Sequence, residues 1–254
     1  MPYQIAEFQH QRDSSTASSI FNNNLTAQIL NSLTGLEKTY TYLYESSCPQ
    51  LTKKTSPKLF ESLERACEMF GLETCPKVFV TRNYSREMVF VRGVNNALII
   101  FSSEYLKRLD DETLFGILAG QVAGIRCKHH TIFFITWGLE FAASFVPAGS
   151  IVVAPFINEW IRCRYFTYDR AFCLATKNRA LSLRQVLINV VPQNILDQMA
   201  LGTNQDAFFE QAENFVKMTN RQANIRSVVS KFSDKDWLPE RFIELKKFFD
   251  ARRF

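Results

Sequence analysis

The sequence predicts an α+β protein that is mostly helical. Of its 254 residues, 46% are apolar and 22% are charged, which is ordinary for a globular chain and argues against a disordered or fibrous protein. Apolar residues recur at helical spacing through most of the chain, and three short β-rich runs stand between turn residues before its middle. A chain of this length can bury a sizeable core.

The first fifty residues differ in composition from the rest. Residues 1–25 are rich in Ser, Asn and Gln, so we expect a partly ordered lead-in. A helix is expected over residues 26–46, where leucines and tyrosines repeat at helical spacing. We therefore divide the chain into a polar lead-in with an N-terminal helix at 1–50 and a single domain at 51–254.

Clear boundary residues mark the next helix. Ser56 is a typical N-cap, Pro57 suits the first turn, and Gly71 is a typical stop. Three β-rich runs follow, and the turn residues between them predict a small antiparallel sheet formed by Lys77–Thr81, Met88–Arg92 and Ala97–Phe101.

The remainder of the chain is predicted to be helical. Asp110 can cap a helix that runs to about His129, and further helices are expected at 159–176, 180–190, 206–230 and 239–250. The apolar region 131–157 holds one ionisable residue, Glu140, but Pro147 and Gly149 divide it into pieces shorter than the ~20 residues of a membrane span. We expect a buried helical hairpin, with a re-entrant or membrane-surface hairpin as the alternative.

The net charge of +5 lies entirely in residues 217–254, which hold ten Lys and Arg against five Asp and Glu. Such a tail suits an anionic membrane, nucleic acid or an acidic partner, but we prefer a solvated helix face that Glu240 and Glu244 share with basic neighbours. No nucleic-acid partner is expected. Because Met1–Ser19 is polar and lacks the apolar region of a signal peptide, we expect a cytoplasmic protein, with membrane association as the alternative.

Three glycines stand on one face of the helix that follows Asp110. Gly116, Gly120 and Gly124 are four residues apart, and each costs about 1 kcal/mol relative to Ala inside a helix. We expect a second helix to pack very closely against this smooth groove, which would offset that cost. The alternative is a pocket for a ligand or a partner side chain.

The stretch Asp111–His129 resembles the active-site helix of HtpX-like zinc metallopeptidases, which reads L-A-H-E-L-G-H-I. In that family two His at i and i+4 bind zinc, and the Glu between them is the general base. The corresponding residues here are Gly120, Gln121 and Gly124, so all three chemical groups are missing.

The second half of the family pattern is also present. Arg164–Ala171 resembles the E-[FY]-x-A-D-R-A helix, whose Glu is the third zinc ligand and whose Asp supports a ligand His. Tyr165 stands at the Glu position, while Asp169 and Arg170 are retained as remnants of the layer behind the ligands. We expect Tyr165 to lie where the metal was, in the groove along Gly116, Gly120 and Gly124.

Three more segments agree with the family in the same order along the chain. They are Pro76–Leu109, with Asn96-Ala97 in register, Cys173–Ile188, and Asp236–Leu245, which Lys235 precedes where the family has His. The resemblance covers roughly residues 55–250. It implies a zincin-like fold in which the small antiparallel sheet packs on the former active-site helix.

The resemblance implies an inactive metallopeptidase-like protein, a pseudo-protease without cofactor that serves as a protein or peptide interaction module. An extended peptide is expected to add to the strand at 97–101 or at 88–92. The first alternative is a membrane-associated regulator that uses the 131–157 hairpin and the basic C-terminus in peripheral membrane contact. The second is a residual metallo-hydrolase with the non-standard ligands Cys127, His130 and Cys163, of which Cys127 and His130 are i,i+3 neighbours.

Overall fold

The computed structural model describes residues 1–22, 37–82, 89–92, 96–145, 149–188, 190–199, 205–221 and 237–252. The chain is mostly helical with one small sheet, which confirms the predicted α+β class. The helices are α1 (Ile5–Phe8), α2 (Gln11–Phe21), α4 (Glu37–Ser47), α5 (Pro57–Phe70), α6 (Ser103–Leu106), α7 (Asp111–Arg126), α8 (His129–Ser144), α9 (Gly149–Thr176), α10 (Arg179–Leu187), α11 (Gln193–Leu196), α12 (Gln205–Arg221) and α14 (Leu238–Arg252). The strands are β1 (Gln50–Leu51), β2 (Lys77–Thr81), β3 (Val89–Arg92) and β4 (Leu98–Ser102).

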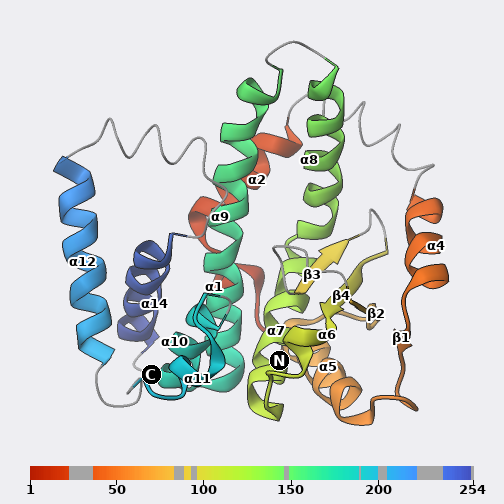
Figure 1. Cartoon of the computed structure of the whole chain (residues 1–254), viewed down its shortest axis with the longest axis horizontal. Helices are drawn as coiled ribbons and strands as arrows, with labels where there is room; N and C mark the ends of the chain where they lie inside the picture. Colours follow the sequence, from red (N-terminus) through yellow and green to blue (C-terminus); the bar gives the residue numbers. More distant parts are fainter. Residues whose placement is uncertain are drawn as a thin grey trace.

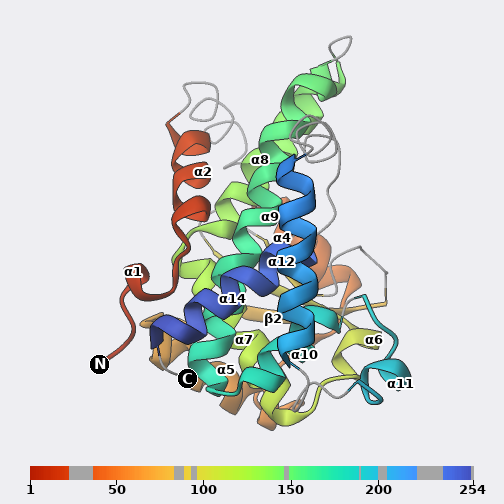
Figure 2. The same cartoon turned by 90° about the vertical axis from the view of Figure 1, so that its left-hand side faces the viewer.

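The helix α9 is central, with the sheet on one side of it and the C-terminal helices on the other (Figure 1). It packs against α7 and α8, and also against α2, α10 and α14. The turned view shows α2 standing beside α9, far from it in sequence (Figure 2). The long helix α9 therefore links the two ends of the chain to its middle.

The sheet is mixed, and the prediction of a purely antiparallel sheet is wrong. Its strand order is β1-β2-β4-β3, with β2 and β4 parallel and β3 antiparallel to β4. The strand β4 lies between β2 and β3. Its five residues are all buried, as is typical of a central strand covered on both faces. The alternation of apolar and polar residues within a run shows which face of a strand is buried, but it does not identify the strands on either side.

The two faces of the sheet meet different helices. Val78, Ile99 and Phe101 belong to the large core that α5 and α7 share. On the other face, Phe79, Leu98 and Ile100 form a smaller cluster that Tyr44 and Cys48, at the end of α4, cover. One face of the sheet thus packs into the same core as the helix with the glycine face, as expected.

The boundary residues of α5 and α7 act largely as predicted. Gly71 ends α5 with φ of +68°, a conformation that glycine adopts without strain. Asp110 caps α7, since its carboxylate accepts a hydrogen bond of 2.7 Å from the Thr113 N–H. Ser56 is the N-cap of α5, but its side chain makes no capping hydrogen bond.

The apolar region 131–157 forms α8 and the first part of α9, which pack against each other as a helical hairpin, but its predicted burial is incomplete because Trp137 and Phe145 are exposed. Both helices extend beyond the predicted segment, to His129 at one end and Thr176 at the other. Among the described residues, no helix is both long and apolar enough to cross a membrane. Of the other predicted helices, α10, α12 and α14 are observed, whereas residues 26–36 and 222–230 lie outside the described residues.

The N-terminal segment is folded, which corrects the expectation of a partly ordered lead-in over its described part. In α2, Asp13, Ala17 and Ile20 lie on one buried face at helical spacing. On the other face, the hydroxyls of Ser18 and Ser19 donate hydrogen bonds to backbone carbonyl oxygens of the preceding turn. Phe8, Ala17 and Ile20 belong to the large core, so this core crosses the predicted boundary at residue 50.

The helix α14 is tied to this N-terminal segment, so the interpretation of its charged face as solvated is wrong. The His10 ring, 6% exposed, lies 2.9 Å from a Glu244 carboxylate oxygen through Nε2. Its Nδ1 accepts a hydrogen bond from the Arg12 N–H, so Nε2 carries the proton and donates to Glu244. Arg12 also pairs with Glu240, at 3.0 Å.

We expect Glu244→Gln to lower stability at neutral pH by about 1–3 kcal/mol, because hydrogen bonds to a charged group are lost. The bond from His10, opposed by burial and aided by Lys247, lowers the pKa of Glu244 from 4.5 to about 2. Since the folded pKa lies below the unfolded one, the carboxylate stabilises the fold above about pH 4.5, and this contribution disappears as the pH falls to about 2.

The measurement is urea unfolding from neutral pH to about pH 2. The stability difference between the natural protein and Glu244→Gln should shrink across the acidic range. The exposed Glu61→Gln is the control. If the plots of unfolding free energy against pH for the natural protein and Glu244→Gln stay parallel down to the lowest pH, the stabilising role given to the Glu244 carboxylate is wrong.

Candidate functional site

The glycine face of α7 is filled by side chains of α9. A Cβ placed on Gly124 would lie 2.5 Å from Tyr168 Cε1, and one on Gly116 would lie 2.4 Å from Phe172 Cε2. At Gly120 the nearest atom is the Tyr168 carbonyl oxygen, at 3.3 Å. This confirms that a second helix packs closely here, and it leaves Gly116 and Gly124 no room for side chains.

The residues that fill the groove are Tyr168 and Phe172, which corrects the expectation that Tyr165 occupies it. Tyr168 and Phe172 are one helical turn apart and match the spacing of the glycines on α7. Tyr165 lies on an adjacent face of α9, where the guanidinium of Arg241 is 4.8 Å from its ring centroid. Its hydroxyl accepts a hydrogen bond of 3.3 Å from Arg164.

The two retained residues after Tyr165 join α9 to its neighbours. Asp169 accepts two hydrogen bonds from Arg241 of α14, at 2.8 and 2.6 Å, and both side chains are 2% exposed. Burial raises the pKa of Asp169, and the bidentate guanidinium opposes that effect. Arg170 lies over the Phe248 ring, 5.2 Å from its centroid. Asp169 therefore holds an arginine where the resemblance implies a histidine.

The position of the family's general base holds a buried neutral amide. Gln121 is 4% exposed, and no described residue donates a hydrogen bond to its Oε1. An amide has no basic lone pair near neutral pH, so it cannot take a proton from water. Gly120, Gln121, Gly124 and Tyr165 thus provide neither a ligand set nor a base.

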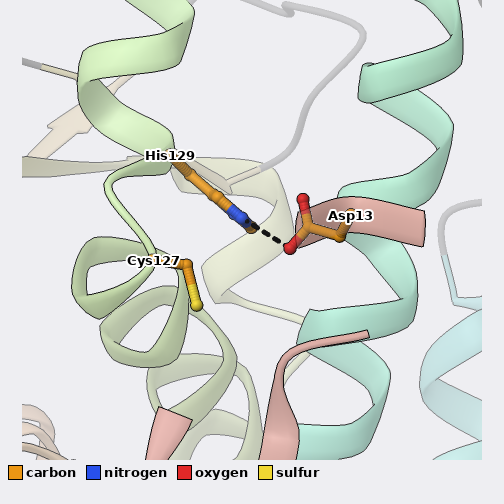
Figure 3. Close-up of side chains that lie close together, drawn as sticks. All are labelled: Asp13, Cys127 and His129. Carbon is orange, nitrogen blue, oxygen red and sulfur yellow. Dashed lines mark hydrogen bonds and ion pairs between the residues drawn. The ribbon is translucent and has the colours of Figure 1, made fainter. Parts of the chain in front are cut away.

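A different group of metal-ligating side chains lies beside this face. Asp13, Cys127 and His129 are buried, and their ligand atoms all lie within 4.8 Å of one another. Figure 3 shows the His129 ring pointing at the Asp13 carboxylate, with Cys127 below the ring in this view. The distance between His129 Nε2 and Asp13 Oδ2 is 2.9 Å. The three residues come from α2, from the end of α7 and from the start of α8.

The predicted set of Cys127, His130 and Cys163 does not form such a group among the described residues. The i,i+3 argument fails because α7 and α8 are separate helices. Cys127 is the C-cap of α7, and Lys128 turns the chain with φ of +60° before α8 begins. Cys163 instead donates to a carboxylate oxygen of Glu159, at 3.4 Å.

The His129 ring covers Gly124 on α7. Its Nδ1 lies 3.1 Å from the place where a Cβ of Gly124 would be. The ring is held between Trp160 and Tyr168, with centroid distances of 5.7 and 5.3 Å. An imidazole from the next helix therefore takes the space beside the position at which the family's second zinc ligand would start.

The hydroxyl of Thr167 orients the Asp13 carboxylate, and a backbone amide orients that hydroxyl. Thr167 donates to Asp13 Oδ2 at 2.6 Å, and Thr167 in turn accepts a hydrogen bond from the His10 N–H at 3.1 Å. Burial acts to raise the pKa of Asp13, but His129 and Thr167 outweigh it and lower this pKa. The hydrogen-bond partners of Asp13 thus favour its charged form.

The Cys127 thiol is not prepared for nucleophilic attack. Burial and the charge of Asp13 raise its pKa, and its side chain is almost fully enclosed. Burial, followed by the charge of Glu159, raises the pKa of Cys163 to about 12. Because the thiolate is the reactive form, neither cysteine forms a catalytic pair with an imidazole here.

Sequence reasoning missed Asp13, Thr167 and Tyr168 as members of this region. Asp13 carried one usable signal, since it begins the i, i+4, i+7 stripe completed by Ala17 and Ile20. The others carried none, because their roles depend on how α9 crosses α7 and on the turn at Lys128.

Comparisons with protein-family models, with curated proteins and with solved structures found no match to this chain. The connection to metallopeptidases is therefore the motif resemblance alone. The geometry of the region has to be interpreted from its own residues.

We expect Gly124→Ala to destabilise the protein by about 1–3 kcal/mol, because the added methyl group meets the Tyr168 ring. This loss outweighs the gain of about 1 kcal/mol that Ala gives inside a helix. Gly120→Ala, whose methyl group has more space, should lose less. The measurement is the free energy of unfolding in urea.

The double variant identifies the cause. In a Tyr168→Leu background the smaller side chain frees the space, so Gly124→Ala should become neutral or stabilising. If Gly124→Ala stabilises the protein even with Tyr168 present, the tight contact between these two positions does not exist.

Proposed function

We propose that this protein is a non-catalytic, metallopeptidase-like interaction module that binds an extended peptide. The observation that carries the proposal is the contact of Tyr168 with Gly124 and Gly120, at the positions where the resemblance places zinc ligands. A zincin-like fold whose ligand positions hold glycines under an aromatic ring has lost the means of hydrolysis. Such a fold keeps the sheet with which it would hold a peptide.

The strand β3 is the favoured peptide-binding edge. It ends the sheet in the order β1-β2-β4-β3 and lies close to α7 and α8. The alternative template at 97–101 is wrong, because β4 pairs with β2 on one side and with β3 on the other. Within the described part of the chain no strand pairs with the outer edge of β3, and a peptide that adds there would form main-chain hydrogen bonds with that edge.

A proline in β3 tests this proposal. The N–H groups of an edge strand point alternately to the paired strand and to the open edge. Of Phe90→Pro and Val91→Pro, one should therefore keep the ladder to β4 and remove only an outward donor, and thermal unfolding identifies it. That variant should bind the peptides selected from an array about tenfold more weakly, because a main-chain hydrogen bond is lost.

The folded proline variant is compared with Val80→Thr in β2, which leaves the β3 edge unchanged. If the folded proline variant binds the selected peptides as tightly as the natural protein, strand addition at β3 is wrong. If an array selects no peptide for the natural protein, the interaction-module proposal itself is contradicted.

A membrane-associated regulator is the second candidate, and two exposed aromatic residues of the hairpin favour it. Trp137 is 49% exposed and Phe145 is 72% exposed, both on α8 or directly after it. The one ionisable group predicted for this region, Glu140, is exposed, and its partial burial raises its pKa. Aromatic side chains of this kind suit the interface of a bilayer.

Liposome flotation tests the second candidate with vesicles of phosphatidylcholine and phosphatidylserine. We expect the natural protein to float with these vesicles and the double variant Trp137→Ser/Phe145→Ser to stay in the dense fraction. The matched control is Tyr42→Ser/Leu43→Ser, which removes two exposed apolar side chains of α4. Equal flotation of both double variants would exclude the hairpin as the contact.

A further inference from the structure

We propose that Asp13, Cys127 and His129 bind a divalent transition-metal cation, with Zn²⁺ as the best fit, and that the ion fastens α2 to the turn between α7 and α8. The inference does not rest on the proposed function. It concerns a buried group that lies beside Gly124 but uses none of the residues at the metallopeptidase ligand positions, and that shares no residue with β3.

The donor set fits zinc. Carboxylate oxygen, thiolate sulfur and imidazole nitrogen are its ordinary protein ligands, at about 2.0–2.3 Å from the metal. Ligand atoms of a tetrahedral site are then about 3.5 Å apart. The three ligand atoms here lie within 4.8 Å of one another, and Asp13 Oδ2 and His129 Nε2 are 2.9 Å apart. Small side-chain rotations therefore bring all three to bonding distance.

The charges also balance. A divalent cation with one carboxylate, one thiolate and one neutral imidazole is a neutral assembly, which is the form that burial favours. The proton of the Cys127 thiol is released to solvent when the sulfur–metal bond forms. His129 would bind through the lone pair of Nε2, with the ring proton on Nδ1, and Asp13 would bind as the carboxylate.

The surroundings hold the ligands in position. Thr167 fixes Asp13 Oδ2, and the rings of Trp160 and Tyr168 fix the plane of His129. Outer contacts of this kind orient the ligands of metal sites. Asp13 and His129 are fully buried and Cys127 is 8% exposed. A water molecule would take the fourth position of the ion, and the burial makes the site structural.

The test uses the full chain after removal of metals with a chelator, and Co²⁺ as the first probe. Tetrahedral Co²⁺ with a thiolate ligand gives a sulfur-to-metal charge-transfer band in the near ultraviolet. We expect this band to saturate at one equivalent and to disappear when Zn²⁺ is added. Elemental analysis of the protein loaded with Zn²⁺ should give one zinc per chain.

Matched variants assign the ligands. Cys127→Ser should abolish the band, and Asp13→Asn should weaken binding by about tenfold or more. Cys163→Ser removes another buried thiol that is outside the group, so it should bind as the natural protein does. Thermal unfolding provides a readout that needs no variant: Zn²⁺ should raise the unfolding temperature of the metal-free protein, because it binds the folded chain.

Three results would overturn the proposal. The first is a folded natural protein that shows no charge-transfer band and retains no zinc, in which case Asp13 and His129 are a buried hydrogen-bonded pair only. The second is a band that persists in Cys127→Ser, which would place the metal elsewhere. The third is an unfolding temperature that Zn²⁺ leaves unchanged. None of these results bears on peptide binding at β3, so the two proposals fail independently.

Discussion

The close contact between α7 and α9 is the constraint on which the rest of the structure depends. Glycines without side chains let the ring of Tyr168 and that of Phe172 lie directly on α7. The helix α9 is thereby fixed against the middle of the core, and the helices α2, α8, α10 and α14 take their positions along it. The energetic cost of glycine inside a helix is offset by this packing.

Two buried polar contacts carry that constraint outward to both ends of the chain. Asp169 of α9 holds Arg241 of α14, and Asp13 of α2 meets His129 at the start of α8. Buried charges of this kind cost free energy unless they are paired, so each contact specifies one arrangement of its two helices. The two ends of the chain thus meet on α9, where His10 also contacts Glu244.

The chemistry of the region follows from the same packing. The space at which a metallopeptidase helix would carry its ligands is taken by an aromatic ring and an imidazole, and the base position holds a buried amide. Three side chains that can bind a metal nevertheless lie close together beside this region. Cys127 and His129 are near the turn between α7 and α8, and Asp13 comes from α2, which is far away in the sequence. A pseudo-protease scaffold and a structural metal site are compatible, because they use different atoms.

The sequence by itself determined the α+β class, the glycine face, the caps at Asp110 and Gly71, and the helical hairpin, because these depend on local periodicity and on single residues. Only the tertiary structure decided that β4 lies between β2 and β3, that Tyr168 and not Tyr165 fills the groove, and that Asp13 joins His129. Those outcomes depend on how helices cross and strands pair. Such contacts form between residues far apart in the chain, and no local pattern encodes them.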